Sequence, residues 1–375
     1  MHEDLADRVR VASRGCTQTV SGRRHQSPAE AFEGLAVACR DLGIDEWDNY
    51  GERGPVTGLE AEVKRLLGTE AAAFFPSGVM AQQVALRIWC DRAGTRRVAM
   101  PDLSHLLVHE LDGPRILHGL QIEHLTSGHQ VATADHLAAL PGHLAAALVE
   151  VPLRDAGCLV PTYDELAALS AACRERGVRL HLDGARIWEA QSHLGRSLPE
   201  IVALADTTYV SFYKGLGGLA GAALAGPVDV IEEARRWRKR MGGTIFRATP
   251  EAVAALVGLR DRLPLMADCV AWGQSMAAAL PSHVTVQPPV PHTGTFRLYA
   301  AGEPDEVNTR LLAYVEERGL ALTPPWTAAT EPGRVTCELA VGPDALELDP
   351  VEVARAVGDL VTASPNVERA AASGA

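Results

Sequence analysis

The chain has 375 residues, of which 47% are hydrophobic, 22% charged and 5% aromatic, and its formal charge is −12. These fractions are typical of a globular protein with a large core, and they exclude disordered, collagen-like and small disulfide-stabilised chains. The negative charge argues against nucleic acid as a partner, because binding to phosphates requires a basic surface.

Helix and strand patterns alternate through the first 260 residues. Apolar spacing predicts helices over 58–67, 79–90 and 163–176, and strands over 71–75, 97–100, 145–151, 178–182, 207–212 and 219–225. Strands separated by helices indicate an α/β domain with a mostly parallel sheet that is covered on both faces.

The pattern changes after Pro264. Helices are predicted over 265–280, 306–318 and 350–363, and strands over 295–299, near 320–323 and over 333–341. These elements indicate a smaller α+β domain. We divide the chain into an N-terminal arm (1–30), a large domain (31–262), a small C-terminal domain (263–365) and a tail (366–375).

Seven cysteines are scattered along the chain without a CxxC pair, which predicts reduced thiols. The first residues lack the features of a signal peptide, and no apolar run reaches the ~18 residues of a membrane span. We therefore expect a cytoplasmic protein without a membrane partner. A basic run over 235–240 follows two glutamates, and we interpret it as a solvated or interface face of a helix.

Three segments at the ends of predicted strands carry candidate site residues, and open α/β sheets bind their ligands at such ends. Ser77 and Gly78 lie in a strand-to-helix turn that offers a hydroxyl and free backbone N–H groups to an anion. Asp183 ends a strand three residues before Arg186. Lys214, one of only three lysines, follows an apolar strand and begins a glycine-rich loop.

Each segment also has a purely structural interpretation. Ser77 could simply cap a helix, and Asp183 with Arg186 could form a local ion pair. Lys214 could extend from its strand end into solvent, whereas burial there would lower its pKa and make it a usable amine.

Two further patterns are weaker. Residues 215–220 fit the relaxed dinucleotide motif GxGxxA, but a short strand rather than a helix is predicted to follow, which argues against a Rossmann site. His105 and His109 are four residues apart, yet no third ligand accompanies them in the sequence, so we expect no metal site.

In chain order, the three segments supply an anion-binding turn, a carboxylate and an amine. Pyridoxal phosphate requires this set, because its phosphate needs backbone donors, its ring nitrogen a carboxylate and its aldehyde an amine. The sequence therefore predicts pyridoxal 5'-phosphate as the cofactor.

These segments also resemble those of the L-threonine aldolase, or β-eliminating-lyase-like, group of fold-type-I pyridoxal-phosphate enzymes. The matching pieces are Tyr50-Gly51-Glu52, Phe75-Pro76-Ser77-Gly78, Ser104-His105, His181-Leu182-Asp183-Gly184-Ala185-Arg186, Lys214-Gly215-Leu216-Gly217, and Arg236-Trp237-Arg238-Lys239 followed by Gly242-Gly243. The resemblance implies a fold-type-I large domain with a seven-stranded sheet. It also implies a homodimer or homotetramer whose sites are shared between subunits.

The resemblance assigns catalytic roles to Lys214, His105 and Asp183. It implies that Lys214 binds the cofactor covalently, that Asp183 holds the pyridine nitrogen and that His105 stacks on the ring. The other cofactor-binding residues that it implies are Arg186 near the phenolic oxygen, and Ser77, Gly78, Val79 and Ser211 around the phosphate. The implied substrate-binding residues are Arg247, Arg334 and Tyr50, and the resemblance implies that either Tyr50 or the N-terminal arm reaches the site of a neighbouring subunit.

The chain departs from the family pattern in four places. Val79 replaces a threonine of the phosphate turn, Tyr213 replaces a serine before the lysine, and the turn after Gly243 is one residue longer. Residues 150–155 also lack a histidine that many of the aldolases place beside the substrate hydroxyl.

The predicted function is cleavage of L-threonine, L-allo-threonine and related β-hydroxy-α-amino acids to glycine and an aldehyde. Because residues 150–155 offer no histidine, we expect little preference between the two diastereomers. The alternatives are β-elimination, racemisation or transamination at the same site, and a non-catalytic relative that binds the cofactor.

Overall fold

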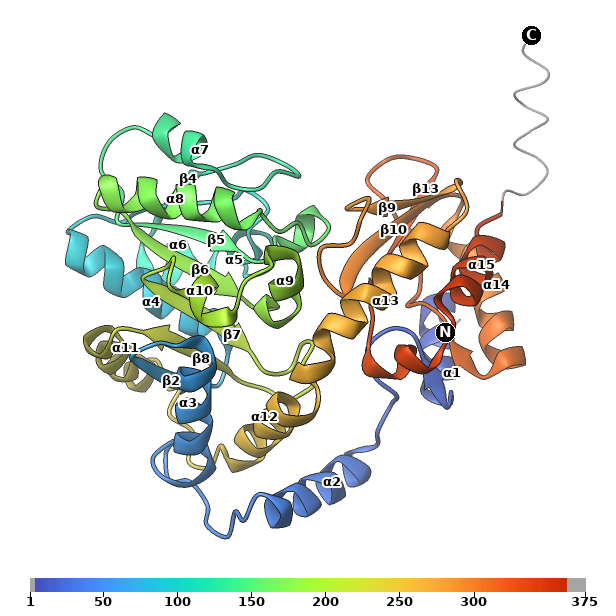
Figure 1. Ribbon diagram of the computed structural model, residues 1–375, viewed down its shortest axis with the longest axis horizontal. Helices are drawn as coiled ribbons and strands as arrows, with labels where there is room; N and C mark the ends of the chain where they lie inside the picture. The colour runs from blue at the N-terminus through green and yellow to red at the C-terminus, as the bar shows by residue number, and fades with distance from the viewer. Residues whose placement is uncertain (1–3, 363–375) are drawn as a thin grey trace. The chain divides into compact units, whose positions relative to one another are not determined.

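The computed structural model describes residues 4–362, which divide into two compact units (Figure 1). One unit comprises residues 27–264, and the other comprises residues 4–26 together with 265–362. The predicted tail over 366–375 lies outside the described residues. Among the described residues, none of the helices is both long enough and apolar enough to span a bilayer.

The unit of residues 27–264 is built around a seven-stranded sheet. Its strands are β2 (Ala71–Phe75), β3 (Arg97–Met100), β4 (Gln121–His124), β5 (Ala146–Glu150), β6 (Arg179–Gly184), β7 (Thr207–Ser211) and β8 (Ala222–Gly226). They are arranged in the order β2-β8-β7-β6-β5-β3-β4, and β8 alone runs against the others. The mostly parallel sheet predicted from the sequence is therefore confirmed.

Helices connect and cover these strands. They are α2 (Pro28–Asp41), α3 (Gly54–Leu67), α4 (Gly78–Ala93), α5 (His105–Val108), α6 (Gly113–His118), α7 (Ala134–Ala139), α8 (Tyr163–Glu175), α9 (Ile187–Leu194), α10 (Leu198–Val202), α11 (Val228–Arg240) and α12 (Thr249–Asp261), with 3-10 turns at Arg154–Ala156 and Leu263–Leu265. Helix α4 packs along the sheet, because its apolar residues, including Val84 and Ile88, share a core with side chains of β2, β3, β5 and β8. Its first turn is thereby fixed beside the end of β2.

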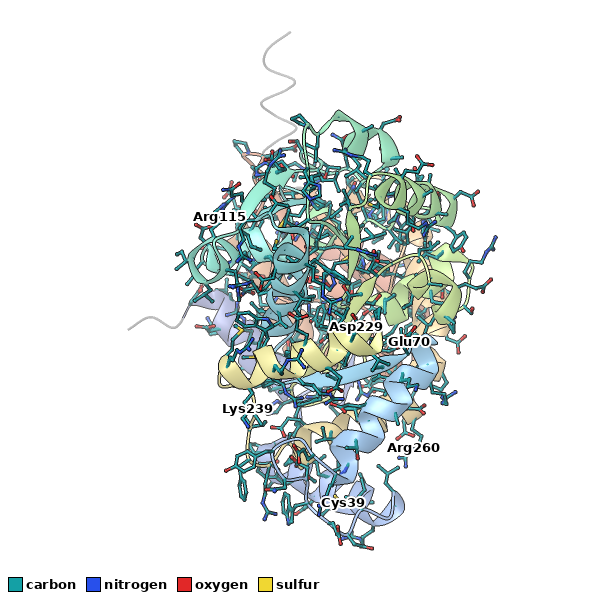
Figure 2. All side chains as sticks on the ribbon, turned by 90° about the vertical axis from the view of Figure 1, so that its left-hand side faces the viewer. Cys39, Glu70, Arg115, Asp229, Lys239 and Arg260 are labelled. Carbon is teal, nitrogen blue, oxygen red and sulfur yellow. The ribbon has the colours of Figure 1, made fainter. Side chains whose placement is uncertain are left out.

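The basic run forms part of α11, as predicted, but two of its arginines are not solvated. Figure 2 shows α11 with Asp229 near its start and Lys239 near its end. Arg235 donates to both oxygens of Glu60, at 2.9 and 2.7 Å, and Arg238 is buried and donates to the carbonyl of Phe74. Glu60 also accepts the backbone N–H of Phe74 at 2.7 Å. This network fixes the end of β2, from which the turn at Ser77 begins.

Replacing Glu60 by glutamine should destabilise the protein by about 3 kcal/mol, because the partly buried guanidinium of Arg235 would lose its carboxylate partner. The urea midpoint, followed by circular dichroism, measures this change. Glu62→Gln is the matched control, since Glu62 lies on the same helix and pairs with the exposed Arg65. An equal midpoint for both variants would show that the buried network contributes nothing.

The second unit contains a four-stranded antiparallel sheet in the order β12-β13-β10-β9. Its elements are α1 (Leu5–Arg14), β1 (Gln18–Thr19), α13 (Met266–Ala279), β9 (Val284–Gln287), β10 (Thr295–Ala301), α14 (Pro304–Arg318), β11 (Leu320–Ala321), β12 (Thr327–Ala328), β13 (Arg334–Ala340), a 3-10 turn (Pro343–Glu347) and α15 (Pro350–Leu360). An α+β unit after Pro264 agrees with the change of pattern seen there.

The N-terminal segment differs from the predicted arm. Residues 4–26 fold with the C-terminal residues, because Val9 of α1 and Val20 are buried in the core of that unit, and α1 contacts α14. Strand β1 also pairs in parallel with β11. Leu5, Val9 and Ala12 have the spacing of an amphipathic helix, a pattern that composition alone does not reveal.

Candidate active site

Three neighbouring parallel strands end in side chains that can do chemistry. Strand β5 ends at Glu150, β6 ends with Asp183 and Gly184, and β7 ends at Ser211, three residues before Lys214. Glu150 is the register partner of Asp183. Because the strands are parallel, their carboxyl ends lie at one edge of the sheet, where the sequence predicted the site.

Asp183 is buried and hydrogen-bonded. Its Oδ1 accepts the N–H of Ala185 at 2.9 Å, and the side chain of Gln82 on α4 also hydrogen-bonds to it. Burial raises the pKa of Asp183 above its usual value, while Lys214 and these hydrogen bonds favour the charged form. A cationic N–H donor opposite this carboxylate would compensate the remaining cost of burial.

Glu150 is a second buried carboxyl group, which the sequence analysis did not single out. Burial and the charge of Asp183 raise the pKa of Glu150 to about 8. Burial disfavours the charged form of both carboxyl groups, whereas Lys214 and the hydrogen bonds of Asp183 favour the charged form of that residue. The signal that could have found Glu150 is the one that found Asp183, an acid at the end of an apolar strand.

Lys214 is half-buried rather than fully extended into solvent. Burial lowers the pKa of its ammonium group below the usual value, and the charge of Arg186 acts in the same direction. The charge of Asp183 opposes this shift. A buried lysine with a lowered pKa is a better nucleophile than a surface lysine.

His105 lies at the start of α5 and is held by two acids. Its backbone N–H donates to Glu150 at 2.6 Å, and its Nε2 lies 3.0 Å from Glu110. Burial, and then the charge of Lys214, lower the pKa of His105 to about 4. Its ring is therefore neutral at pH 7.

The strand-to-helix turn after β2 is open to an anion. Ser77 is the N-cap residue of α4, but its side chain makes no capping hydrogen bond, so the simple capping interpretation is wrong. A Cβ atom at Gly78 would lie 2.2 Å from the hydroxyl of Tyr209, so only glycine allows this close approach. Val79 follows in the first turn. The side chain of Ser211 is buried and interacts with the hydroxyl of Tyr209.

Arg186 precedes α9 as its N-cap residue. Its Nε lies 3.7 Å from Glu189. The charge of Arg186 partly offsets the rise in the pKa of Asp183 and adds to the lowering of the pKa of Lys214. Arg186 therefore belongs to the same cluster as these two residues.

Tyr50 and Arg247 form a different group. The ring of Tyr50 lies 5.2 Å from that of Phe246, and the guanidinium of Arg247 stacks 5.0 Å from Phe246 and 4.7 Å from Trp47. Among the described residues, no hydrogen bond, ion pair or ring contact joins Tyr50 or Arg247 to Lys214. Arg334 begins β13 in the other unit, where it donates to Thr285 at 3.2 Å and pairs with Glu331.

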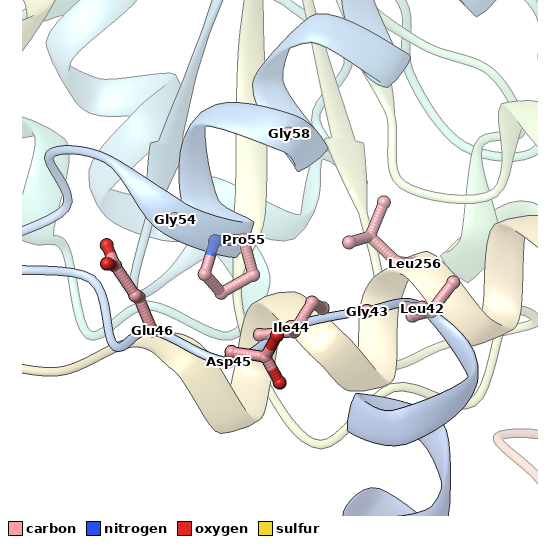
Figure 3. A pocket seen from close by; sticks show the side chains of 9 residues that line it. All are labelled: Leu42, Gly43, Ile44, Asp45, Glu46, Gly54, Pro55, Gly58 and Leu256. Carbon is pink, nitrogen blue, oxygen red and sulfur yellow. The ribbon is translucent and has the colours of Figure 1, made fainter.

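Two cavities of the 27–264 unit lie apart from the strand ends. One of about 510 Å³ lies between the 42–46 segment, the start of α3 and Leu256 of α12 (Figure 3). Another of about 660 Å³ is lined by residues around Tyr50 and by Arg235, Arg236 and Lys239 of α11. Apart from Tyr50, none of the predicted cofactor- or substrate-binding residues lines either cavity.

The strand-end cluster fits pyridoxal phosphate. The uncapped first turn of α4, with Gly78 in close contact with Tyr209, and the nearby hydroxyl of Ser211 suit a phosphate. The buried carboxylate of Asp183 suits a protonated ring nitrogen, and the half-buried amine of Lys214, with its lowered pKa, suits an aldehyde. Each donor or acceptor that the cofactor needs is therefore present at one edge of the sheet.

Comparison with known proteins agrees with this geometry. The sequence model of the family described as "Beta-eliminating lyase" matches residues 42–302. A protein of Listeria monocytogenes EGD-E, whose crystal structure carries the provisional name L-allo-threonine aldolase, superposes with a TM-score of 0.87. The two chains are 33% identical, over 96% of this chain and 99% of that one.

Two curated relatives are similar in sequence. The low-specificity L-threonine aldolase 1 of Arabidopsis thaliana is 31% identical over 218 residues, which are 55% of this chain and 60% of that protein. The low specificity L-threonine aldolase of Escherichia coli (strain K12) is 31% identical over 60% of this chain and 69% of its own length. The chain therefore spans about three fifths of the first relative and belongs to the beta-eliminating lyase family, which includes the threonine aldolases.

Proposed function

We propose that this protein is a pyridoxal-phosphate-dependent lyase that cleaves L-threonine, L-allo-threonine and related β-hydroxy-α-amino acids to glycine and an aldehyde. The observation that carries the proposal is the half-buried amine of Lys214, whose charge acts on the buried carboxylate of Asp183. The names of the Arabidopsis and Escherichia coli relatives support the same reaction and substrate class.

When bound, the cofactor supplies an electron sink for the pair released as a bond to Cα breaks. Asp183 holds a proton on the ring nitrogen, and its hydrogen bonds from Gln82 and Ala185 keep the carboxylate oriented for this task. Lys214 would hold the aldehyde of the cofactor through Nζ, and the same nitrogen can accept and return a proton. The lowered pKa of Lys214 favours both tasks, because a larger fraction of the amine is then in its neutral form.

The remaining residues bind and orient. Ser77, Gly78, Val79 and Ser211 would hold the phosphate, Arg186 would bind near the phenolic oxygen, and the neutral ring of His105 would stack on the pyridine. Arg247 would bind the substrate carboxylate, and Tyr50 would contribute to the site of a neighbouring subunit. The exposed positions of Tyr50 and Arg247 are consistent with a site completed by another copy of the chain.

We further propose a homodimer or homotetramer in the cytoplasm. All seven cysteines are free thiols, as expected in a reducing compartment. Large apolar side chains, among them Phe32, Trp47 and Phe246, are exposed on the 27–264 unit and would be covered by a second copy.

The reaction is tested by incubating the cofactor-loaded protein with L-threonine and, separately, with L-allo-threonine. We expect each substrate to release glycine and acetaldehyde in a 1:1 ratio. Chromatography measures the glycine, and coupled oxidation measures the aldehyde. Formation of 2-oxobutanoate, or loss of chirality without cleavage, would contradict the aldolase reaction but not the cofactor site.

A further inference from the structure

A histidine–aspartate pair lies beside the Lys214 cluster and has no role in the chemistry described so far. Nε2 of His109, at the end of α5, lies 2.8 Å from Oδ2 of Asp155 in the 3-10 turn after β5. The carboxylate of Asp155 is largely buried, whereas the side chain of His109 is 37% exposed. The two residues are 46 positions apart in the chain, so only folding brings them together.

The pair borders the space around Lys214. The ring of His109 lies 4.8 Å from that of His105, which itself contacts Glu150 through its backbone N–H. The charges of Lys214 and His109 both act on His105 and on Glu110, and the charge of Asp155 acts on Glu150. The pair therefore lies among the groups that surround the reacting amine.

We propose that His109, oriented by Asp155, is the base that removes the proton from the substrate β-hydroxyl group. The inference rests on the proposed function and names one of its catalytic residues. If the Nε2–H of His109 donates to Asp155, its Nδ1 carries the free lone pair, and Nδ1 makes no hydrogen bond among the described residues. A carboxylate that fixes one tautomer of a histidine in this way is a recurrent arrangement for a general base.

His105 is the competing base, and its environment argues against it. Its backbone is tied to Glu150 and its Nε2 lies 3.0 Å from Glu110. With a pKa of about 4 it is also a weak base at neutral pH. Asp155, by contrast, would stabilise the imidazolium that forms when His109 accepts a proton.

The step balances without a further reactant. The hydroxyl proton moves to Nδ1 of His109, and the O–H electron pair becomes the second bond of the aldehyde. The Cα–Cβ bond breaks, and its electron pair remains with the glycine fragment, which later takes up a proton at Cα. His109 then returns its proton to water, which its partial exposure allows.

This arrangement changes the expected stereochemistry. Little preference between diastereomers was expected because residues 150–155 carry no histidine. His109 now reaches this segment from α5, and a base held in one orientation serves one configuration at Cβ better than the other. We therefore expect the wild-type protein to prefer one diastereomer, and His109→Asn to lose that preference.

The kinetic test compares two reactions of the holoenzyme. His109→Asn should lower kcat for threonine cleavage by about 10²- to 10⁴-fold, whereas exchange of the glycine α-proton in D₂O should stay within about threefold, because glycine has no β-hydroxyl group. His129→Asn, an exposed histidine outside the cluster, is the matched control. An equal loss of both reactions, or no loss of cleavage, would overturn the proposal.

Asp155 acts through His109, so its test needs a readout other than turnover. In the ¹⁵N NMR spectrum of the histidine side chains we expect His109 with a proton on Nε2 and none on Nδ1. Asp155→Asn should shift this tautomer and lower cleavage while leaving glycine exchange unchanged. A proton on Nδ1 in the wild-type protein would overturn the assignment even if the protein cleaves no threonine.

A bound cation is the alternative use of the same residues. His105, His109 and Asp155 each offer one ligand atom, and these atoms lie within 4.8 Å of one another. We expect dialysis against EDTA to leave cleavage unchanged. Loss of cleavage that Zn²⁺ restores would overturn the role of His109 as a base. If the wild-type protein releases no glycine from threonine but exchanges the glycine α-proton, the proposed function fails instead.

Discussion

Lys214→Ala should lose the visible absorption band of the bound cofactor and cleave threonine at least about 10²- to 10⁴-fold more slowly, the range for removal of a proton-transferring group. The reason is that Lys214 is the only lysine of the described residues that is not exposed. Lys64 and Lys239, the only other lysines, are both exposed. The visible absorption of the cofactor-loaded protein and single-turnover kinetics measure the two effects.

Lys64→Ala and Lys239→Ala are the matched controls, because they remove the same charge from exposed positions on α3 and α11. Both should retain the absorption band and turnover. If Lys214→Ala kept them as well, the covalent attachment point would lie elsewhere.

Asp183→Asn should retain cofactor but lose about 3 kcal/mol of transition-state stabilisation, or roughly 10²-fold in kcat. An amide cannot hold the ring nitrogen in its protonated form, so the electron sink becomes weaker. Asparagine has the same shape, and its oxygen can still accept the N–H of Ala185. The measurement is kcat for threonine at a fixed, saturating cofactor concentration.

Asp206→Asn is the control for this variant. Asp206 accepts the N–H of Leu180 at 2.8 Å, so it binds the same strand, β6, at its opposite end. If removing a carboxylate from β6 merely damaged the structure, Asp206→Asn would lose turnover as well. Turnover like that of the wild-type protein in Asp183→Asn would show that Asp183 is only a structural acid.

Local patterns predicted the sheet because its strands are short apolar runs with clear ends. Strands β2 and β3 have the predicted bounds, 71–75 and 97–100. Helices α1, α2 and α12 were not predicted. In α2, alanine and charged residues interrupt the apolar face, so the helical pattern is weak. The position of α1 depends on its packing against α14, a long-range contact.

In the candidate site too, residues marked by local sequence patterns were predicted and residues that act through long-range contacts were not. Asp183 and Lys214 were found because each stands at a strand end, and the position of a strand end is a local property. Gln82 and the His109–Asp155 pair were missed because their roles depend on contacts across the fold. Gln82 reaches Asp183 from α4, and Asp155 lies 46 residues from His109. Neither contact produces a regular spacing of residues that could be recognised in the sequence.

The position of the cofactor linkage tests the site most directly. The holoenzyme is reduced with sodium borohydride, digested with a protease and analysed by tandem mass spectrometry. We expect the visible band to disappear and a pyridoxyl group to be found on Lys214. A pyridoxyl group on Lys64 or Lys239, or no labelled lysine at all, would contradict the assignment of this site.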